Sequence, residues 1–290
     1  MSNPSQSESP APTLPAVDYL LIGHLSEDRT PDGITLGGTV CYSGLTAHVL
    51  GHSVGLITAA SERVDLGPLD DLTLVVKPSP ESTSFENIYT PEGRIQTIFS
   101  QAVSLVQEDI PPEWMNARLV HVAPLIGEFS SDILDSFQSS FIGLTPQGLM
   151  REWDSSGRIS ALTWEAASEF IRVADAVVVS IEDFNMDEEA AEDMATQCSV
   201  MVLTKGPGGA RVWADGQVRS MPAPPANELD ATGAGDVFAP VFFSRYTSLG
   251  DPWLAAETAI RLATASVGRS GLSGTPTPDE VQDALRREGS

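Results

Sequence analysis

Short apolar runs alternate with helix-like segments along most of the chain. Residues 17–22 form the first run, which ends at Gly23, and residues 40–50 follow with the spacing of a helix. Further strand-like runs lie at 54–58, 119–123, 141–144, 176–180 and 201–204, and further helical segments at 131–139, 163–173, 187–197 and 253–267. Strands that alternate with helices predict a mostly parallel sheet covered on both faces, with ligands bound beyond the carboxyl ends of its strands.

The region between residues 72 and 100 breaks this alternation. Residues 72–77, 84–90 and 94–100 have the pattern of strands, no helix separates them, and Pro91-Glu92-Gly93 has the composition of a hairpin turn. We therefore predict a small antiparallel β-insert on the α/β body. Such an insert acts as a lid over a site at the sheet edge, or is an edge hairpin without a role.

A strong negative charge limits the partners of this protein. The 290 residues include 40 acidic and 16 basic ones, which gives a net charge of −24 and a pI of about 4.3. A field of this sign repels phosphate at long range, so we expect no nucleic-acid partner and no binding to anionic membranes. Any phosphate must be held locally, by backbone amides, a metal ion or a few placed cations.

The cysteines and the apolar runs indicate a cytoplasmic protein. Cys41 and Cys198 lie far apart and form no disulfide framework, which favours a reducing compartment. No apolar run reaches about eighteen residues, so the sequence predicts no membrane span. Residues 1–16 are rich in Ser and Pro and lack the pattern of a secretory signal. We expect a disordered leader there, followed by a single domain at 17–290.

The segment most informative about chemistry is residues 230–236, which read D-A-T-G-A-G-D and precede an apolar stretch. Two glycine steps before a predicted helix point several backbone N–H groups at one spot, where the helix dipole also favours an anion. Asp236 lies at the mouth of this anion hole, and a carboxylate there is suited to accept a proton from an attacking hydroxyl. A helix start with a capping Asp and closely packed glycines is the alternative.

This segment resembles the signature of the PfkB (ribokinase-like) carbohydrate kinases, D-T-x-G-A-G-D at the start of a helix. Residues 37–51, 204–210, 259–266 and 276–281 resemble other segments of the same family, so the likeness extends over about residues 17–285. It implies a ribokinase-like three-layer α/β/α sandwich with a mostly parallel central sheet and a small antiparallel β-lid, here about residues 24–39 and 72–100. Residues 85–89 in the hairpin are similar to an inositol-kinase-like subgroup, which favours a polyol substrate.

The resemblance also implies roles for individual residues. Asp236 corresponds to the catalytic base, and the amides of Gly233, Ala234 and Gly235 to the donors that hold the transferred phosphoryl group. The residues matching the nucleotide site are Thr204, Lys205, Gly206, Gly209 and Thr264. Those matching the substrate site are Asp28, Gly37, Gly38, Tyr42, Gln147 and Arg151. Asp183 and Glu182 match carboxylates that organise Mg²⁺ through water, and Asp230 and Thr232 match a monovalent-cation site, which implies K⁺.

Several positions depart from the family pattern. Ser180 stands where the family usually has an Asn that helps organise Mg²⁺, and Tyr42 lies near the position of an Asn that touches substrate. Pro240 falls early in the helix after Asp236, which we expect to be tolerated only if the first turns are irregular. His48 and His52 are four residues apart but lack the Glu of a zinc protease motif, and the sequence contains no Walker A motif.

The sequence therefore predicts ATP-dependent transfer of the γ-phosphoryl group to a hydroxyl of a small sugar or polyol, with Mg²⁺ as cofactor. A nucleoside kinase, with Tyr42 and Phe85 stacking on a base, is the first alternative. A non-catalytic member that binds a sugar or nucleotide is the second, and Ser180 is its support. We also expect a homodimer that forms through the exposed face of the β-lid.

Overall fold

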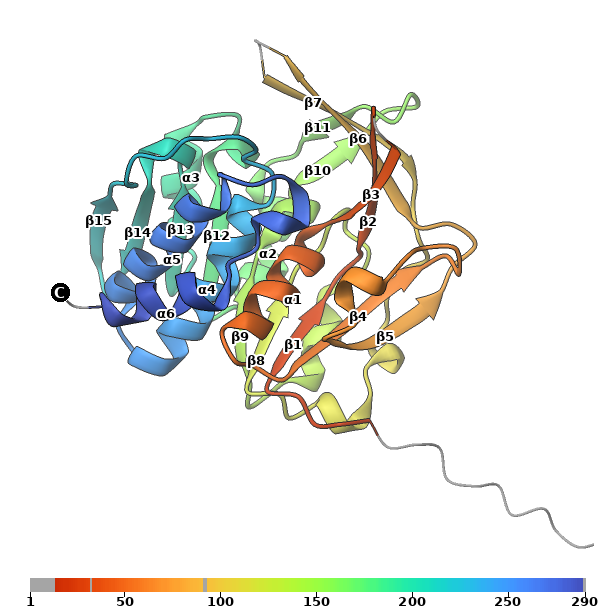
Figure 1. The fold of residues 1–290 in the computed structure, drawn as a ribbon, viewed down its shortest axis with the longest axis horizontal. Coiled ribbons are helices and arrows are strands. Elements are labelled where there is room, and N and C mark those ends of the chain that lie inside the picture. The colour runs from red at the N-terminus through yellow and green to blue at the C-terminus, as the bar shows by residue number, and fades with distance from the viewer. Residues whose placement is uncertain (1–13, 32, 91–92, 289–290) are drawn as a thin grey trace, which may run out of the picture.

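The protein is described by a computed structural model, which covers residues 14–31, 33–90 and 93–288 of the 290 (Figure 1). Most of the predicted leader, and two residues of the predicted turn, Pro91 and Glu92, lie outside the described residues. A nine-stranded sheet crosses the body in the order β15-β14-β13-β12-β9-β8-β1-β4-β5. Seven of these strands are parallel, and β14 and β15 are antiparallel additions at one edge.

The inner parallel strands are short and almost fully buried, as the apolar runs predicted, whereas the edge strand β5 is half-buried and the edge strand β15 is mostly exposed. Their bounds are β1 (Tyr19–Ile22), β4 (Val54–Ala60), β5 (Thr73–Pro78), β8 (Leu119–Val122), β9 (Phe141–Leu144), β12 (Ala176–Ser180), β13 (Val200–Thr204), β14 (Ala210–Ala214) and β15 (Gln217–Met221). Successive side chains point to opposite faces: Tyr19 and Leu21 enter one core, Leu20 and Ile22 the other. Both faces of the sheet are therefore covered, and this confirms the three-layer α/β/α sandwich.

Helices of unequal length form the two outer layers. One layer holds α1 (Thr39–Val49), α4 (Ala234–Leu249), α5 (Pro252–Ser266) and α6 (Pro278–Arg286), which pack on the core that contains Tyr19. The other holds α2 (Ser168–Ile171) and α3 (Glu188–Ala195) with several 3₁₀ turns. Residues 131–139 were predicted to be helical, but Ser131–Ser136 form a 3₁₀ helix, in keeping with the weak helix propensity of their Ser and Asp residues.

A separate four-stranded sheet stands at one end of the body, in the order β3-β2-β6-β7. Its strands are β2 (Ser26–Thr30), β3 (Gly33–Gly37), β6 (Thr83–Thr90) and β7 (Gly93–Ser100). The prediction that residues 72–77 belong to this lid was wrong, because β5 pairs in parallel with β4 inside the main sheet. The connection from β4 to β5 contains only the 3₁₀ turn Gly67–Leu69, and the absence of a helix there concealed the crossover.

A second hairpin was not predicted. β10 (Arg151–Trp153) and β11 (Ile159–Ala161) pair antiparallel and lie beside the lid sheet (Figure 1). Three-residue strands are too short to show an alternating pattern in the sequence. Among the helices that the structure describes, none has both the length and the apolar character needed to cross a membrane.

Candidate active site

The anion hole predicted at residues 230–236 lies at the beginning of α4. Gly233 is the N-cap of this helix, with φ of +80°. A Cβ atom at Gly233 would lie 2.4 Å from the Cδ1 and Cε1 atoms of Tyr42, so a side chain is excluded both by the backbone conformation and by the ring. A Cβ atom at Gly235 would meet nothing within 4 Å, so there is open space beside the first turn of α4. The N–H of Ala234 donates to the carbonyl oxygen of Ala231 over 3.2 Å, and the N-terminus of the helix favours an anion in this space.

Pro240 lies inside α4, and the helix continues through it without interruption. Proline has no N–H, so the carbonyl oxygen of Asp236, four residues earlier, lacks its helical donor. The hydroxyl of Ser43, which is fully buried on α1, donates to this oxygen over 2.8 Å. The irregular first turns expected from Pro240 are therefore unnecessary, because a side chain of another helix replaces the missing donor.

Tyr42 lies within the influence of three carboxylates. The pKa of the Tyr42 hydroxyl is raised far above its ordinary value. Burial is the largest cause, and the negative charges of Asp236, Asp28 and Asp230 add to it. The hydroxyl therefore keeps its proton at neutral pH. Asp28 also lies against Gly37, since a Cβ atom there would come within 2.4 Å of its Oδ2 atom. The structure thus brings these predicted residues of the substrate and catalytic sites into one place.

Asp230 fastens the loop in front of the anion hole. Its Oδ1 atom accepts from the N–H of Thr232 (2.9 Å) and its Oδ2 atom from the N–H of Gly271 (3.0 Å). Partial burial opposes ionisation, but these hydrogen bonds outweigh it and lower the pKa of Asp230. The side chain of Asp230 therefore joins the loop to the segment after α5.

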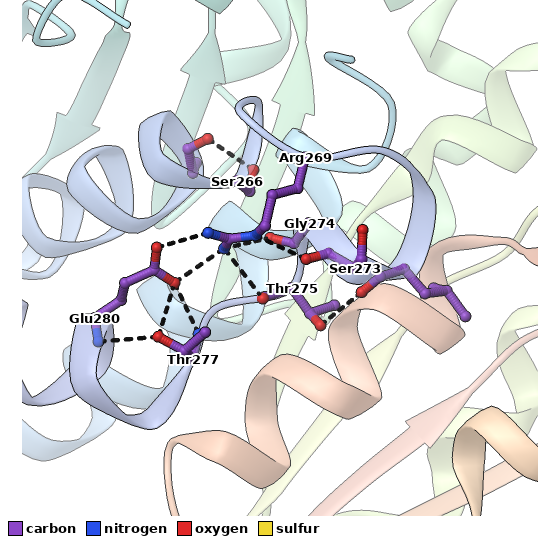
Figure 2. Close-up of polar contacts among 9 residues, drawn as sticks. Ser266, Arg269, Ser273, Gly274, Thr275, Thr277 and Glu280 are labelled. Atoms are coloured by element: carbon purple, nitrogen blue, oxygen red, sulfur yellow. Dashed lines mark hydrogen bonds and ion pairs between the residues drawn. The ribbon is translucent and has the colours of Figure 1, made fainter. Parts of the chain in front are cut away.

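An Arg–Glu clamp, which the sequence did not reveal, shapes that segment (Figure 2). Arg269 forms a bidentate ion pair with Glu280, with N–O distances of 2.8 and 2.9 Å. Arg269 also donates to the carbonyls of Ser273, Gly274 and Thr275, so one side chain holds three successive residues of the turn. Gly271, which binds Asp230, begins the same turn. The clamp therefore supports the loop of the anion hole indirectly.

The predicted nucleotide-site residues lie at the carboxyl end of β13 and on α5. Thr204 ends β13, Gly206 begins a 3₁₀ turn, and Thr264 is half-buried on α5. Gly209 has φ of +86°, and a Cβ atom there would come within 2.0 Å of the Met221 carbonyl oxygen. The ammonium group of Lys205 forms an ion pair with Glu188 of α3.

The predicted Mg²⁺ carboxylates occupy the turn after β12. Asp183 Oδ2 accepts from the N–H of Ser180 (3.1 Å), and the Ser180 hydroxyl accepts from the N–H of Glu182 (3.2 Å), which closes a capping box. Within the described residues, no three His, Cys, Asp or Glu side chains gather as a metal-binding group. Mg²⁺ is usually held by one or two carboxylates together with water and phosphates, so Asp183 and the exposed Glu182 fit such an ion.

The predicted acceptor loop at residues 145–151 is tied to this turn. Gln147 Nε2 donates to Asp183 Oδ1 over 3.1 Å, and Arg151 begins strand β10. The prediction that Tyr42 and Phe85 offer faces for stacking is contradicted, because they are only 4% and 1% exposed. Tyr42 packs on the Gly233 loop, and Phe85 packs in a small core with Ile98.

Comparisons with known proteins agree with this geometry. The model of the pfkB family carbohydrate kinases matches residues 158–279, which hold the anion hole and Arg269 of the clamp. This part of the chain is therefore similar to the pfkB carbohydrate kinases. A cytidine kinase of Thermococcus kodakarensis is 26% identical over 263 residues, and the match covers 85% of this chain and 93% of that kinase.

Solved structures show that this protein has the ribokinase fold. A pyrophosphate-dependent kinase in the ribokinase family, complexed with a pyrophosphate analog and myo-inositol, has a TM-score of 0.78 at 21% identity, covering 91% of this chain and 99% of that one. A putative ribokinase II from E. coli, complexed with ATP and Mg²⁺, has a TM-score of 0.69 at 15% identity, covering 93% and 99%. The resemblance read from the sequence is thereby confirmed for the family and the fold.

Proposed function

We propose that this protein transfers the γ-phosphoryl group of ATP to a hydroxyl group of a small polyhydroxylated molecule. The observation that carries the proposal is the open N-terminus of α4, with Asp236 in its first turn and Asp28 nearby across Tyr42. The N-terminus of α4 suits a phosphoryl group, because a helix N-terminus favours an anion. The two carboxylates suit a molecule with several hydroxyls, because carboxylates accept hydrogen bonds from hydroxyl groups.

In this mechanism the protein supplies positioning and electrostatic stabilisation, as phosphoryl transfer generally requires. Asp236 accepts the proton of the attacking hydroxyl, while the amides of residues 233–235 bind the oxygens of the phosphoryl group as charge develops on them. Asp183 and Glu182 would hold Mg²⁺ through water, and the ion would supply positive charge beside the phosphates. This local compensation matters because the chain as a whole carries a net charge of −24.

Two classes of acceptor have support. A sugar or polyol is supported by the paired carboxylates and by the likeness of the fold to a kinase solved with myo-inositol. A nucleoside is supported by the cytidine kinase, which matches 85% of this chain. That relative makes the ribose hydroxyl of a nucleoside a specific second candidate, although neither Tyr42 nor Phe85 presents a face for its base.

A screen of donor–acceptor pairs tests the proposal. Sugars, polyols and nucleosides are offered with Mg²⁺ and either ATP or pyrophosphate, and phosphorylated product is measured. Asp236→Asn is expected to lower kcat/KM by at least about 100-fold, because the carboxylate that accepts the proton is gone. Asp135→Asn, at an exposed position of a 3₁₀ turn, is the matched control and is expected to match the wild type. Tight ATP binding without turnover of any acceptor would instead indicate the non-catalytic alternative.

The same assay tests the proposed K⁺ site at Asp230 and Thr232. Activity is compared in buffers that contain K⁺, Na⁺ or a bulky organic cation at equal ionic strength. We expect faster turnover in K⁺, because a cation bound beside the loop would favour the arrangement of amides at the start of α4. Equal rates in all three buffers would remove the cation from the proposal.

A further inference from the structure

The lid meets the body at three buried polar residues, His24, Thr83 and Glu128, which form the lid joint. His24 is fully buried and lies between β1 and β2, where the chain first enters the lid. Its Nδ1 atom lies 2.9 Å from the hydroxyl of Thr83, the first residue of β6. Its Nε2 atom lies 3.0 Å from the carbonyl oxygen of Val103, shortly after β7 ends. One imidazole ring therefore contacts three stretches of chain that enter or leave the lid.

The partners of His24 determine where its proton lies. A carbonyl oxygen only accepts, so Nε2 carries the proton and donates to Val103. Burial is the largest influence on the pKa of His24 and lowers it, although the charge of Glu128 opposes this effect. The ring is therefore neutral, and Nδ1 accepts from the Thr83 hydroxyl, whose oxygen accepts in turn from the N–H of Ala102 over 3.1 Å. Each hydrogen bond in this chain has one direction, which specifies a single arrangement.

Glu128 holds the same joint through backbone groups. It is 1% exposed, and its Oε1 atom accepts from the N–H of His24 over 2.7 Å. Its carboxylate also accepts from the N–H groups of Leu125 (2.9 Å) and Ile126 (2.9 Å), which follow β8. Its carbonyl oxygen accepts from the N–H of Leu105, after β7, over 3.0 Å. Glu128 therefore ties the loop after β8 to a segment that enters the lid and to a segment that leaves it.

A small apolar core continues the joint into the lid sheet. Leu125 and Ile126 pack with Phe85 of β6 and Ile98 of β7, and all four side chains are buried. These side chains fill the space between the lid sheet and the loop after β8. The base of the lid therefore rests on the body through packed side chains as well as hydrogen bonds.

The lid joint lies at the start of the strand that carries Asp28. β2 and β6 pair in parallel, with Asp28 opposite Phe85. His24 and Thr83 hold these two strands together at the end where their pairing begins. Asp28 lies four residues after His24, and a Cβ atom at Gly37 would come within 2.4 Å of its Oδ2 atom. A shift at the base of β2 would therefore carry the carboxylate of Asp28 with it.

Electrostatic repulsion makes such an anchor necessary. The charges of Asp28, Asp236 and Asp230 all act on Tyr42, so three carboxylates are held in one region. Like charges at short range repel, and the repulsion is stronger in partly buried surroundings than in water. This force favours movement of the lid, with Asp28, away from the start of α4. The hydrogen bonds and the packing at the base of the lid oppose it.

We propose that His24, Thr83 and Glu128 are positioning residues for the acceptor: they hold the base of the lid against the body, so that the Asp28 carboxylate is in place before the acceptor binds. The inference rests on the proposed phosphotransfer, in which Asp28 accepts hydrogen bonds from the acceptor. A binding group must be held within about 0.5 Å of its productive position, and a loosened joint loses this precision. Any closing movement is then confined to the strands beyond Asp28.

Replacing Thr83 by valine removes the hydroxyl of the joint and keeps a branched side chain. Kinetics are measured with ATP, Mg²⁺ and whichever of myo-inositol, ribose and cytidine the wild type phosphorylates. Thr83→Val is expected to raise the KM for that acceptor at least about fivefold, with the KM for ATP within about twofold of the wild type. Thr83→Ser, which keeps the hydroxyl, is expected to match the wild type.

Thr258→Val is the matched control. Thr258 is also fully buried, and its hydroxyl donates over 3.2 Å to the Leu254 carbonyl within α5, outside the lid. This variant loses a buried hydrogen bond as Thr83→Val does, so the two are expected to lose similar stability. Only Thr83→Val is expected to change the KM for the acceptor.

Hydrogen exchange tests the joint without turnover. The amides of His24, Ala102 and Leu105 each donate to a partner in or beside the joint, so we expect slow exchange in the wild type. In Thr83→Val these amides are expected to exchange at least about tenfold faster, while the amides of β1 keep their wild-type rates.

The two experiments separate this inference from the proposed function. The positioning role is overturned by an acceptor KM in Thr83→Val within about twofold of the wild type, by an equal rise in Thr258→Val, or by an equal rise in Thr83→Ser. Wild-type amides at His24 and Ala102 that exchange as fast as in an unstructured peptide overturn the fixed joint. If the wild type phosphorylates no acceptor, the phosphotransfer proposal fails, whereas slow exchange at these amides still supports the joint. Circular dichroism checks that every variant is folded.

Discussion

Replacing Ser43 by alanine tests the contact that allows a proline inside α4. Ser43→Ala removes the hydroxyl that donates to the Asp236 carbonyl, which Pro240 leaves without a helical donor. Loss of a partner from a buried backbone carbonyl costs about 1–3 kcal/mol of unfolding free energy. We expect a loss in this range by urea denaturation, together with a lower kcat, because Asp236 loses one of its anchors.

Two further variants isolate the cause. In Pro240→Ala the new N–H of residue 240 can donate to the Asp236 carbonyl, so adding Ser43→Ala to that background is expected to cost less than it does alone. Ser248→Ala is the control, because the Ser248 hydroxyl donates over 2.8 Å to the Ser244 carbonyl, which retains a helical donor. If Ser43→Ala costs the same, within about 0.5 kcal/mol, with and without Pro240, the reasoning is refuted.

Three further predictions concern the anion hole, the clamp and the lid. Gly233→Ala is expected to lower kcat at least about tenfold, since the new methyl group would meet the Tyr42 ring, whereas Gly250→Ala, at φ +67° with no neighbour within 4 Å, keeps its activity. Partial burial opposes the ionisation of Glu280, but its hydrogen bonds outweigh this effect and lower its pKa below 4.5. The ionised side chain therefore stabilises the fold above pH 4.5, and this stabilisation is lost as the pH falls. The melting temperature of Glu280→Gln is expected to fall less on acidification than that of the wild type. The proposed homodimer would form through the outer face of the lid, where Ile34 is 66% exposed. Light scattering is expected to show a dimer for the wild type and a monomer for Ile34→Glu. A monomeric wild type would exclude the dimer.

Periodicity was sufficient for the main layers but not for the lid. Buried parallel strands appear in a sequence as continuous apolar runs, and those runs located the parallel strands of the body, whereas no predicted run marked the antiparallel strands β14 and β15. The strand Thr73–Pro78 was misplaced because the hydrophobic pattern of a strand does not specify its partner, and the usual sign of a parallel crossover, a helix, is missing before it. The strands of the β10–β11 hairpin are only three residues long, so they left no pattern.

The candidate site was predictable where its residues are adjacent in sequence. The D-A-T-G-A-G-D segment forms one loop and one helix start, so its spacing alone indicated an anion hole. Contacts between distant residues were not predictable: the Ser43 hydroxyl and the Asp236 carbonyl are 193 positions apart. Arg269 and Glu280 are separated by a turn whose shape they themselves fix. Such pairs depend on tertiary packing, which no local pattern records.

The four-stranded lid sheet also has a consequence for how the chain folds. Its strands form two hairpins, residues 26–37 and 83–100, and the pairing of β2 with β6 that joins them requires the chain between them, which includes β4 and β5 of the body, to be closed into a loop. Closing long loops costs entropy before the contacts that repay it are made, so sheets of this kind form slowly. We expect the lid to become ordered after the body during refolding. The sheet that carries Asp28 is then the last part of the molecule to be completed.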